Sequence, residues 1–161
     1  MPVTPVSPSA GQLIDKTFWD AQVFQQFTDL YASWTSYTPT WTGATTNPVL
    51  GNGTLDGGYR AIGKTIAIRI RLVIGSTTTL GSGLWSLSLP SGLAPAAIQS
   101  ISGFASNSSG SSRYALAGLL TAAAGVFRIA AADGTSGASG TAPFAWATGD
   151  QLVLTGVYEA S

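Results

Sequence analysis

The chain has 161 residues, which suits one domain with a sizeable core and a small extra segment. Only 9% of the residues are charged and the formal net charge is zero, so composition favours neither a nucleic-acid partner nor an anionic membrane. No Cys and no His occur, which excludes disulfides, thiol nucleophiles, imidazole bases and the commonest transition-metal ligands. A secretory signal pattern and a membrane-spanning apolar run are also lacking, so we expect a soluble chain made in the cytosol.

The low charge has two interpretations. Charged residues usually make up about 25% of a solvated globular chain. In the first, much of the surface of this chain is buried between identical copies. In the second, the surface is rich in Ser and Thr, which are uncharged but well hydrated. We favour burial between copies.

The first ten residues carry Pro2, Pro5 and Pro8, which predict an extended tail that cannot join a helix or a central strand. Such a tail is ordered only when something holds it. This pattern points to docking on a neighbouring chain or a larger assembly.

Residues 11–34 switch to helical spacing, with Asp15 or Thr17 as the N-cap. Apolar residues return every three or four positions and form a wide aromatic stripe. The helix is expected either to pack on its own β domain or to associate with copies of itself, and we favour the second. The residues assigned to this oligomer or anchor surface are Phe18, Trp19, Val23, Phe24, Phe27, Leu30, Tyr31 and Trp34.

The rest of the chain has period-two alternation between turn signals. The strongest case is 65–74, where Ile66, Ile68, Ile70, Leu72 and Ile74 share one face and Arg69 and Arg71 the other. Residues 36–42 predict an edge strand because of Pro39. Further strands or bends are expected at 53–62, 84–89, 100–106, 113–120, 125–132, 144–146 and 151–159.

Eight or nine short strands separated by turns are typical of an antiparallel sandwich or jelly roll. The predicted fold class is therefore mainly β: an antiparallel, jelly-roll-like β-sandwich preceded by an extended tail and one α-helix. We expect a tail-and-helix segment over 1–35 and a β-sandwich head over 36–161.

Catalytic residues are not predicted. The helix holds Asp15, Asp20 and Asp29, and Asp56, Asp133 and Asp150 each sit beside glycine in turns, where Asp bonds the backbone. No EF-hand spacing or phosphate loop occurs, so we expect no metal and no cofactor. Among the aromatics, Trp85 and Trp146 are expected in the core, whereas Tyr59 and Tyr114 are candidate ligand contacts through sugar stacking.

One resemblance covers residues 36–159. The segments Tyr37-Thr-Pro-Thr-Trp41, Gly51-Asn-Gly-Thr-Leu55, Gly83-Leu-Trp85, Leu87-Ser-Leu-Pro90 and Gly149-Asp-Gln-Leu152 resemble a pattern of bacteriophage and prophage structural proteins. That family comprises minor tail proteins, tail-fibre heads and other virion appendages, commonly trimeric.

The resemblance implies a non-enzymatic virion component assembled in the host cytoplasm. Its expected partners are itself, as a homotrimer, other virion proteins through residues 1–35, and a host-surface glycan, with no nucleic acid and no membrane. The alternative is a purely architectural capsid spike, collar or decoration protein without receptor binding.

Overall fold

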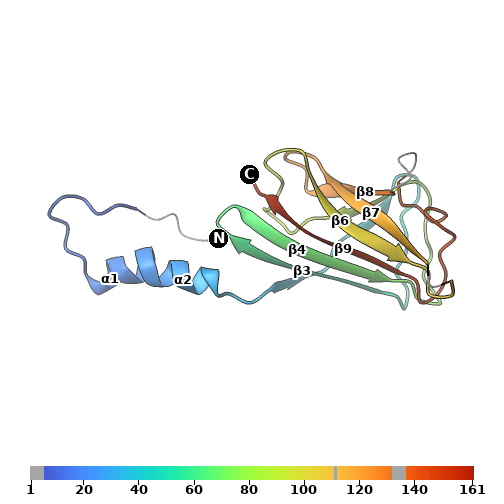
Figure 1. Ribbon diagram of the computed structural model, residues 1–161, viewed down its shortest axis with the longest axis horizontal. Helices are drawn as coiled ribbons and strands as arrows, with labels where there is room; N and C mark the ends of the chain where they lie inside the picture. Colours follow the sequence, from blue (N-terminus) through green and yellow to red (C-terminus); the bar gives the residue numbers. More distant parts are fainter. Residues whose placement is uncertain (1–5, 111, 132–136) are drawn as a thin grey trace.

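The computed structural model describes residues 6–110, 112–131 and 137–161. A single helix projects from one end of an antiparallel β domain (Figure 1). The strands are β1 (Thr35–Tyr37), β2 (Trp41–Gly43), β3 (Thr54–Ile62), β4 (Thr65–Val73), β5 (Trp85–Ser88), β6 (Gln99–Ser106), β7 (Arg113–Leu120), β8 (Val126–Ala131) and β9 (Gln151–Glu159). The prediction of a mainly β, antiparallel fold is confirmed.

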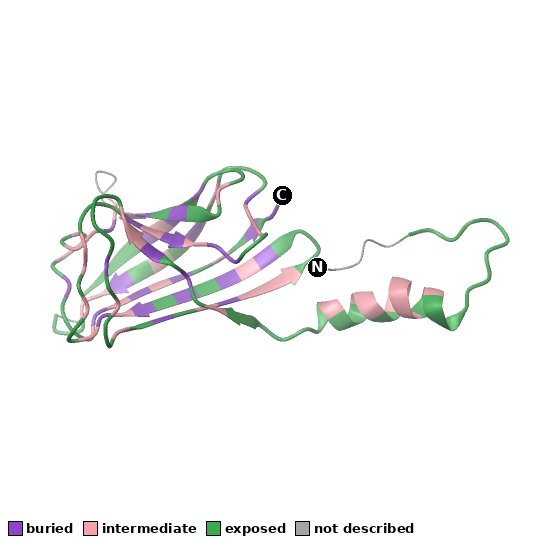
Figure 2. Ribbon diagram, turned by 180° about the vertical axis from the view of Figure 1, so that it is seen from behind, coloured by how far each residue is buried: buried purple, intermediate pink, exposed green. Residues whose placement is uncertain are grey.

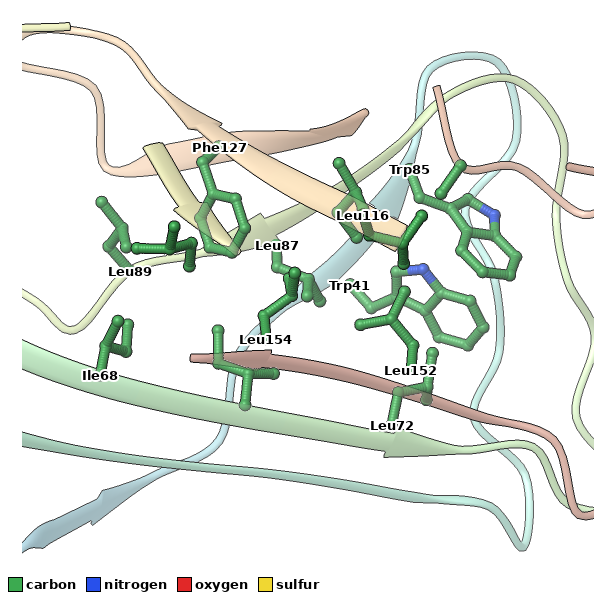
Figure 3. Close-up of a cluster of buried hydrophobic side chains, with 14 of the residues drawn as sticks. Trp41, Ile68, Leu72, Trp85, Leu87, Leu89, Leu116, Phe127, Leu152 and Leu154 are labelled. Atoms are coloured by element: carbon green, nitrogen blue, oxygen red, sulfur yellow. The ribbon is translucent and has the colours of Figure 1, made fainter. Parts of the chain in front are cut away.

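The strands form one nine-stranded sheet in the order β1-β3-β4-β9-β6-β7-β8-β5-β2. Every pairing is antiparallel. The sheet curls into a half-barrel, so that β5, β7 and β8 face β4 and β9 across the core (Figure 3).

The prediction of a single edge strand over 36–42 is wrong in one respect. The chain breaks at Pro39 into β1 and β2, which lie at the two opposite edges of the sheet. Pro39 has no N–H for a ladder, so the chain leaves one edge there and joins the other. The curl brings these edges together, and the Tyr37 hydroxyl of β1 donates to Ser88 O of β5, the neighbour of β2, at 3.5 Å.

The alternation of β4 sets the position of the core. Ile66, Ile68, Ile70 and Leu72 are buried on the inner face, while Arg69 and Arg71 point outward. β3 and β9 pair with β4 along its whole length, so Leu72 lies between Leu55 and Leu152. Burying each such side chain stabilises the fold by about 1.5–3 kcal/mol, which fixes the register of this strand.

The same alternation of inward and outward side chains, followed from strand to strand, places all five arginines on the outer face of the sheet. They are Arg60 of β3, Arg69 and Arg71 of β4, Arg113 of β7 and Arg128 of β8. The core therefore contains no arginine, and the outer face carries most of the positive charge of the chain.

The β domain has two ends, which we call the helix end and the loop end (Figure 1). The helix end carries the β3–β4 and β7–β8 turns and the segment 89–98, which are joined by the Ala123 N–H to Pro95 O bond of 2.8 Å. The loop end carries 44–53, 74–84, 107–110 and 147–150. There the Thr79 N–H donates to Val49 O, and the Gly149 N–H to Ile74 O.

The helix is shorter than the predicted 11–34. It comprises α1 (Lys16–Trp19), a π-helical turn η1 (Asp20–Phe24) and α2 (Gln25–Leu30). Asp15 is the N-cap, as predicted, and its Oδ1 accepts from the Phe18 N–H at 2.8 Å. The helix ends at Leu30 because the chain must become extended to pair β1 with β3 from Thr35. Among the described residues, none of the helices has both the length and the apolar character to cross a membrane.

Candidate functional site

The helix has large apolar side chains that no other residue described by the structure buries. None of its residues is buried, as Figure 2 shows by the absence of purple along it. Phe24 is 63% exposed and Tyr31, just after the helix, is 79% exposed. We define the helix surface as the exposed residues Trp19, Phe24, Phe27, Leu30 and Tyr31.

Phe18 and Val23, also predicted for this surface, are partly covered. Part of the cover comes from the preceding segment, because the Val6 N–H donates to Gln22 Oε1 at 2.6 Å. Residues 1–5, with Pro2 and Pro5 of the predicted tail, lie outside the described residues. A helix of about 15 residues is marginal alone in water, so this helix depends on packing that its own domain does not supply.

Trp34, the last residue predicted for the anchor, lies after the helix and contacts the sheet. The guanidinium of Arg69 lies over its ring, 5.0 Å from the centroid. Gly58, opposite Arg69 on β3, leaves room for this arrangement, since a Cβ there would meet Arg69 Nε at 3.0 Å. Trp34 therefore holds the start of β1 to the outer face.

A small pocket of about 170 Å³ separates the base of the helix from β3. Asp29 of α2 and Arg60 of β3 both line it, together with Tyr59. The Asp29 Oδ2 and Arg60 Nε atoms are buried without a hydrogen-bond partner, while Asp29 Oδ1 accepts from Gln25 Nε2 at 3.0 Å. The pocket holds one acid and one base.

The two candidate ligand contacts, Tyr59 and Tyr114, lie at opposite ends of the molecule. Tyr59 is at the helix end and packs edge-on against Tyr37, with ring centroids 5.9 Å apart. Tyr114 is the second residue of β7, at the loop end, and is 38% exposed. The structure therefore does not bring them into one site.

Tyr114 is the outer end of a row of aromatic rings. It packs on Phe144 with centroids 5.0 Å apart, and Phe144 packs on Trp146 at 4.7 Å. Trp146 then contacts Trp85, and Trp85 contacts Trp41. The prediction that Trp85 and Trp146 are core residues is confirmed. Only the Tyr114 end of this row is available to a ligand.

Asp150 organises the loop end. Its side chain is buried and accepts from the Ser108 N–H, the Ser108 hydroxyl and the Ala147 N–H at 2.7–2.9 Å. This confirms the predicted backbone-bonding role of Asp150. Asp133 lies outside the described residues. Within the described part of the chain, no three acidic side chains gather as a metal site would require.

Two tyrosines, Tyr37 on the edge strand β1 and Tyr158 on β9, have raised pKa values. Burial, more than the neighbouring Tyr59, raises the pKa of Tyr158 to about 12. Burial also raises the pKa of Tyr37, with Tyr158 as a smaller cause. The Tyr158 hydroxyl donates to Leu93 O at 2.8 Å and the Tyr37 hydroxyl to Ser88 O at 3.5 Å, so both hydroxyls bond within the chain.

Sequence reasoning missed a groove on the outer face. It has a volume of about 380 Å³ and is lined by Ser86, Leu119, Thr121, Val126, Phe127 and Arg128. These residues come from the β7–β8 hairpin and from β5, which is distant from it in sequence and pairs with β8 in the folded sheet. Only the strand order could have revealed it.

No protein-family model, curated protein or solved structure matches this chain. A functional conclusion must therefore come from its own geometry. That geometry defines a mainly β head with an exposed aromatic helix at one end and loops at the other.

Proposed function

We propose that this chain is a structural protein of a bacteriophage virion. It forms a trimeric appendage, a tail fibre or minor tail protein, that is attached through residues 1–35 and carries the β domain outward. The observation that carries this proposal is the placement of the helix surface and the loops at opposite ends of the molecule (Figure 1). A mount at one end and a free head at the other is the arrangement that an appendage needs.

The exposure of the helix surface supports self-association, because association would bury it. Trp19, Phe24 and Phe27 are each more than half exposed. Apolar area gains about 25 cal/mol per Å² when it leaves water, so packing these rings between subunits is favourable by several kcal/mol. In a closed ring of identical subunits, each neighbouring subunit can supply a surface that covers these rings.

We propose that the head has the architecture of a jelly-roll-like sandwich. Its curled sheet sets side chains of β4 and β9 against side chains of β5, β7 and β8, with Trp85, Leu87 and Leu154 between them (Figure 3). Such a closed core keeps a head rigid while its loops vary.

The loop end is the part of the head proposed to meet a host-surface glycan. Tyr114 and Phe144 offer an aromatic surface for a sugar ring there. A purely architectural spike, collar or decoration protein is the second candidate. The hydrogen bonds of the loop end favour this second candidate. Asn52 bonds Thr77 and Ser76 there, so its polar groups are paired within the chain and are not directed at a ligand.

Sedimentation velocity of the full chain tests the trimer. The wild-type chain is expected at three times its 16.4 kDa mass. The double variant Phe24→Ser/Phe27→Ser is expected to dissociate, whereas Val49→Ser, equally exposed but at the loop end, is expected to stay trimeric. A monomeric wild-type chain would overturn the self-association.

Labelling tests the virion role. Antibodies against the purified chain are expected to decorate intact phage particles in electron micrographs. Unlabelled particles, from a phage whose genome carries this sequence, would refute the assignment.

A glycan array separates the two candidate functions. Binding that Tyr114→Ala abolishes and Tyr59→Ala preserves supports the receptor-binding head. A silent array with the full trimeric chain supports the architectural protein.

A further inference from the structure

The groove on the outer face has an apolar wall and a cationic rim. Leu119, Arg128 and Ser86 lie side by side on β7, β8 and β5, because Leu119 pairs with Arg128 and Arg128 with Ser86. Leu119 is 43% and Val126 is 48% exposed, although both are aliphatic. A sheet surface of this kind gains stability when an apolar group covers it.

The groove lies at the helix end of the domain. Leu119 is next to the last residue of β7 and Val126 is the first of β8, so the groove borders the turn between them. That turn meets Pro95 through the Ala123 N–H, and Pro95 in turn bridges Ala160 beside the β3–β4 turn. The groove and the helix thus lie at the same end of the β domain. The groove is formed by β5, β7 and β8, whereas the helix precedes β1.

The chemistry of the groove suits an aromatic side chain. Its volume of about 380 Å³ admits a ring against Leu119 and Val126, with the Arg128 guanidinium at the rim. The chain already uses this pairing elsewhere on the same face, where Arg69 lies over Trp34. A guanidinium over an aromatic face is attracted to the ring, and the attraction strengthens as water is excluded.

Charge also favours the helix as the occupant. Residues 1–35 carry Lys16 against Asp15, Asp20 and Asp29, a net charge of −2. Residues 36–161 carry the remaining six bases against four acids, a net charge of +2. The arginines are all on the outer face, so an acidic, aromatic helix and a basic, apolar sheet face complement each other.

We propose that the helix surface of one subunit docks on the outer-face groove of the next subunit. This inference rests on the self-association in the proposed function and specifies the surface that receives the helix. The two contacting surfaces differ, so the interface is head-to-tail, and a rotation that closes such a contact produces a ring. A trimer then holds three identical helix-to-groove contacts instead of one bundle of helices.

Charged substitutions in the groove test the proposal in the full chain. The double variant Leu119→Glu/Val126→Glu places two negative charges on the apolar wall of the groove. Both positions are exposed, so the change leaves the core intact. We expect this groove variant to sediment as a monomer, like the helix variant Phe24→Ser/Phe27→Ser. Val49→Glu, exposed at the loop end, is the matched control and is expected to remain a trimer.

Mixing the two variants gives the decisive result. The groove variant keeps an intact helix, and the helix variant keeps an intact groove, so an equimolar mixture is expected to form a 1:1 dimer that cannot close. A groove variant that stays trimeric while the helix variant dissociates would overturn the proposal and leave the self-association standing, as helix-to-helix packing. A monomeric wild-type chain would overturn both.

A disulfide test avoids dependence on destabilising charges. The chain has no Cys, so the variant Phe27→Cys/Val126→Cys carries only the two introduced thiols. Under mild oxidation we expect covalent dimers and trimers on a denaturing gel, and none from Phe27→Cys/Val49→Cys. Bonds formed only within single chains would contradict a contact between subunits.

Discussion

The guanidinium carbon of Arg69 lies 5.0 Å from the centre of the Trp34 ring. This contact connects the last residue before β1 to the outer face of β4, the strand at the centre of the β3-β4-β9 group. It holds the segment just before β1 against the outer face of the head. The junction between the helix and the domain therefore includes this surface contact as well as the pocket that Asp29 and Arg60 line.

Removing Arg69 is expected to loosen this junction without unfolding the head. Arg69→Ala deletes a partly exposed cation–π contact of about 0.5–1 kcal/mol. Hydrogen exchange of amides 31–37 should accelerate several-fold, while the amides of β9 stay protected. Arg71→Ala is the control, because Arg71 bonds Gln151 at 3.3 Å and does not contact Trp34. Equal acceleration in both variants would contradict a specific role for Arg69.

Gly103 of β6 is expected to be the least replaceable glycine of the sheet. A Cβ at this position would collide with the backbone carbonyl of Val153 and lie 2.8 Å from Leu154 Cδ2, so β6 and β9 would have to separate. Gly103→Ala should lower the free energy of unfolding by about 2–4 kcal/mol in a urea titration. Gly125→Ala, with open space around the new carbon, should change it by less than about 1 kcal/mol. Similar losses in both would refute the close approach.

Asp150 is expected to be the polar side chain on which the loop end depends most. Asp150→Ala leaves the N–H groups of Ser108 and Ala147 without their acceptor in a buried place. The free energy of unfolding should fall by about 2–4 kcal/mol. Asp56→Ala, on the exposed side of β3, provides the comparison and should cost little. The idea fails if chemical denaturation finds the two variants equally stable.

Alkaline pH is expected to weaken the fold through Tyr158. Its pKa is about 12 in the folded chain and 10.0 when unperturbed, chiefly because the ring is buried. The folded state holds the proton more tightly, so this stability is complete below pH 10 and is lost as pH rises to about 12. The loss should be on the order of 1–2 kcal/mol. Tyr158→Phe should flatten the decline, and an unchanged pH profile would contradict the assignment.

Much of the β domain could be predicted from local pattern. The alternation in β4 gave its inner and outer faces, and Pro39 marked an edge, because both depend on neighbouring residues alone. Asp15 as N-cap and Asp150 as a turn residue were predictable for the same reason.

Other features depend on which strands become neighbours. The split of 36–42 between two sheet edges follows from the curl of the sheet, and the groove exists only because β5, β7 and β8 are adjacent. The separation of Tyr59 from Tyr114 also depends on strand direction. The π-helical turn at Asp20–Phe24 had no local signal in the sequence.

The row of rings from Tyr114 to Trp41 gives the head an optical property. Indoles held about 5 Å apart at fixed tilts, such as Trp41, Trp85 and Trp146, couple their electronic transitions. The near-ultraviolet circular dichroism of the chain should therefore be intense and should vanish when this packing loosens, even while the strands persist. The protein thus contains its own spectroscopic reporter of head integrity, independent of whether its subunits are assembled.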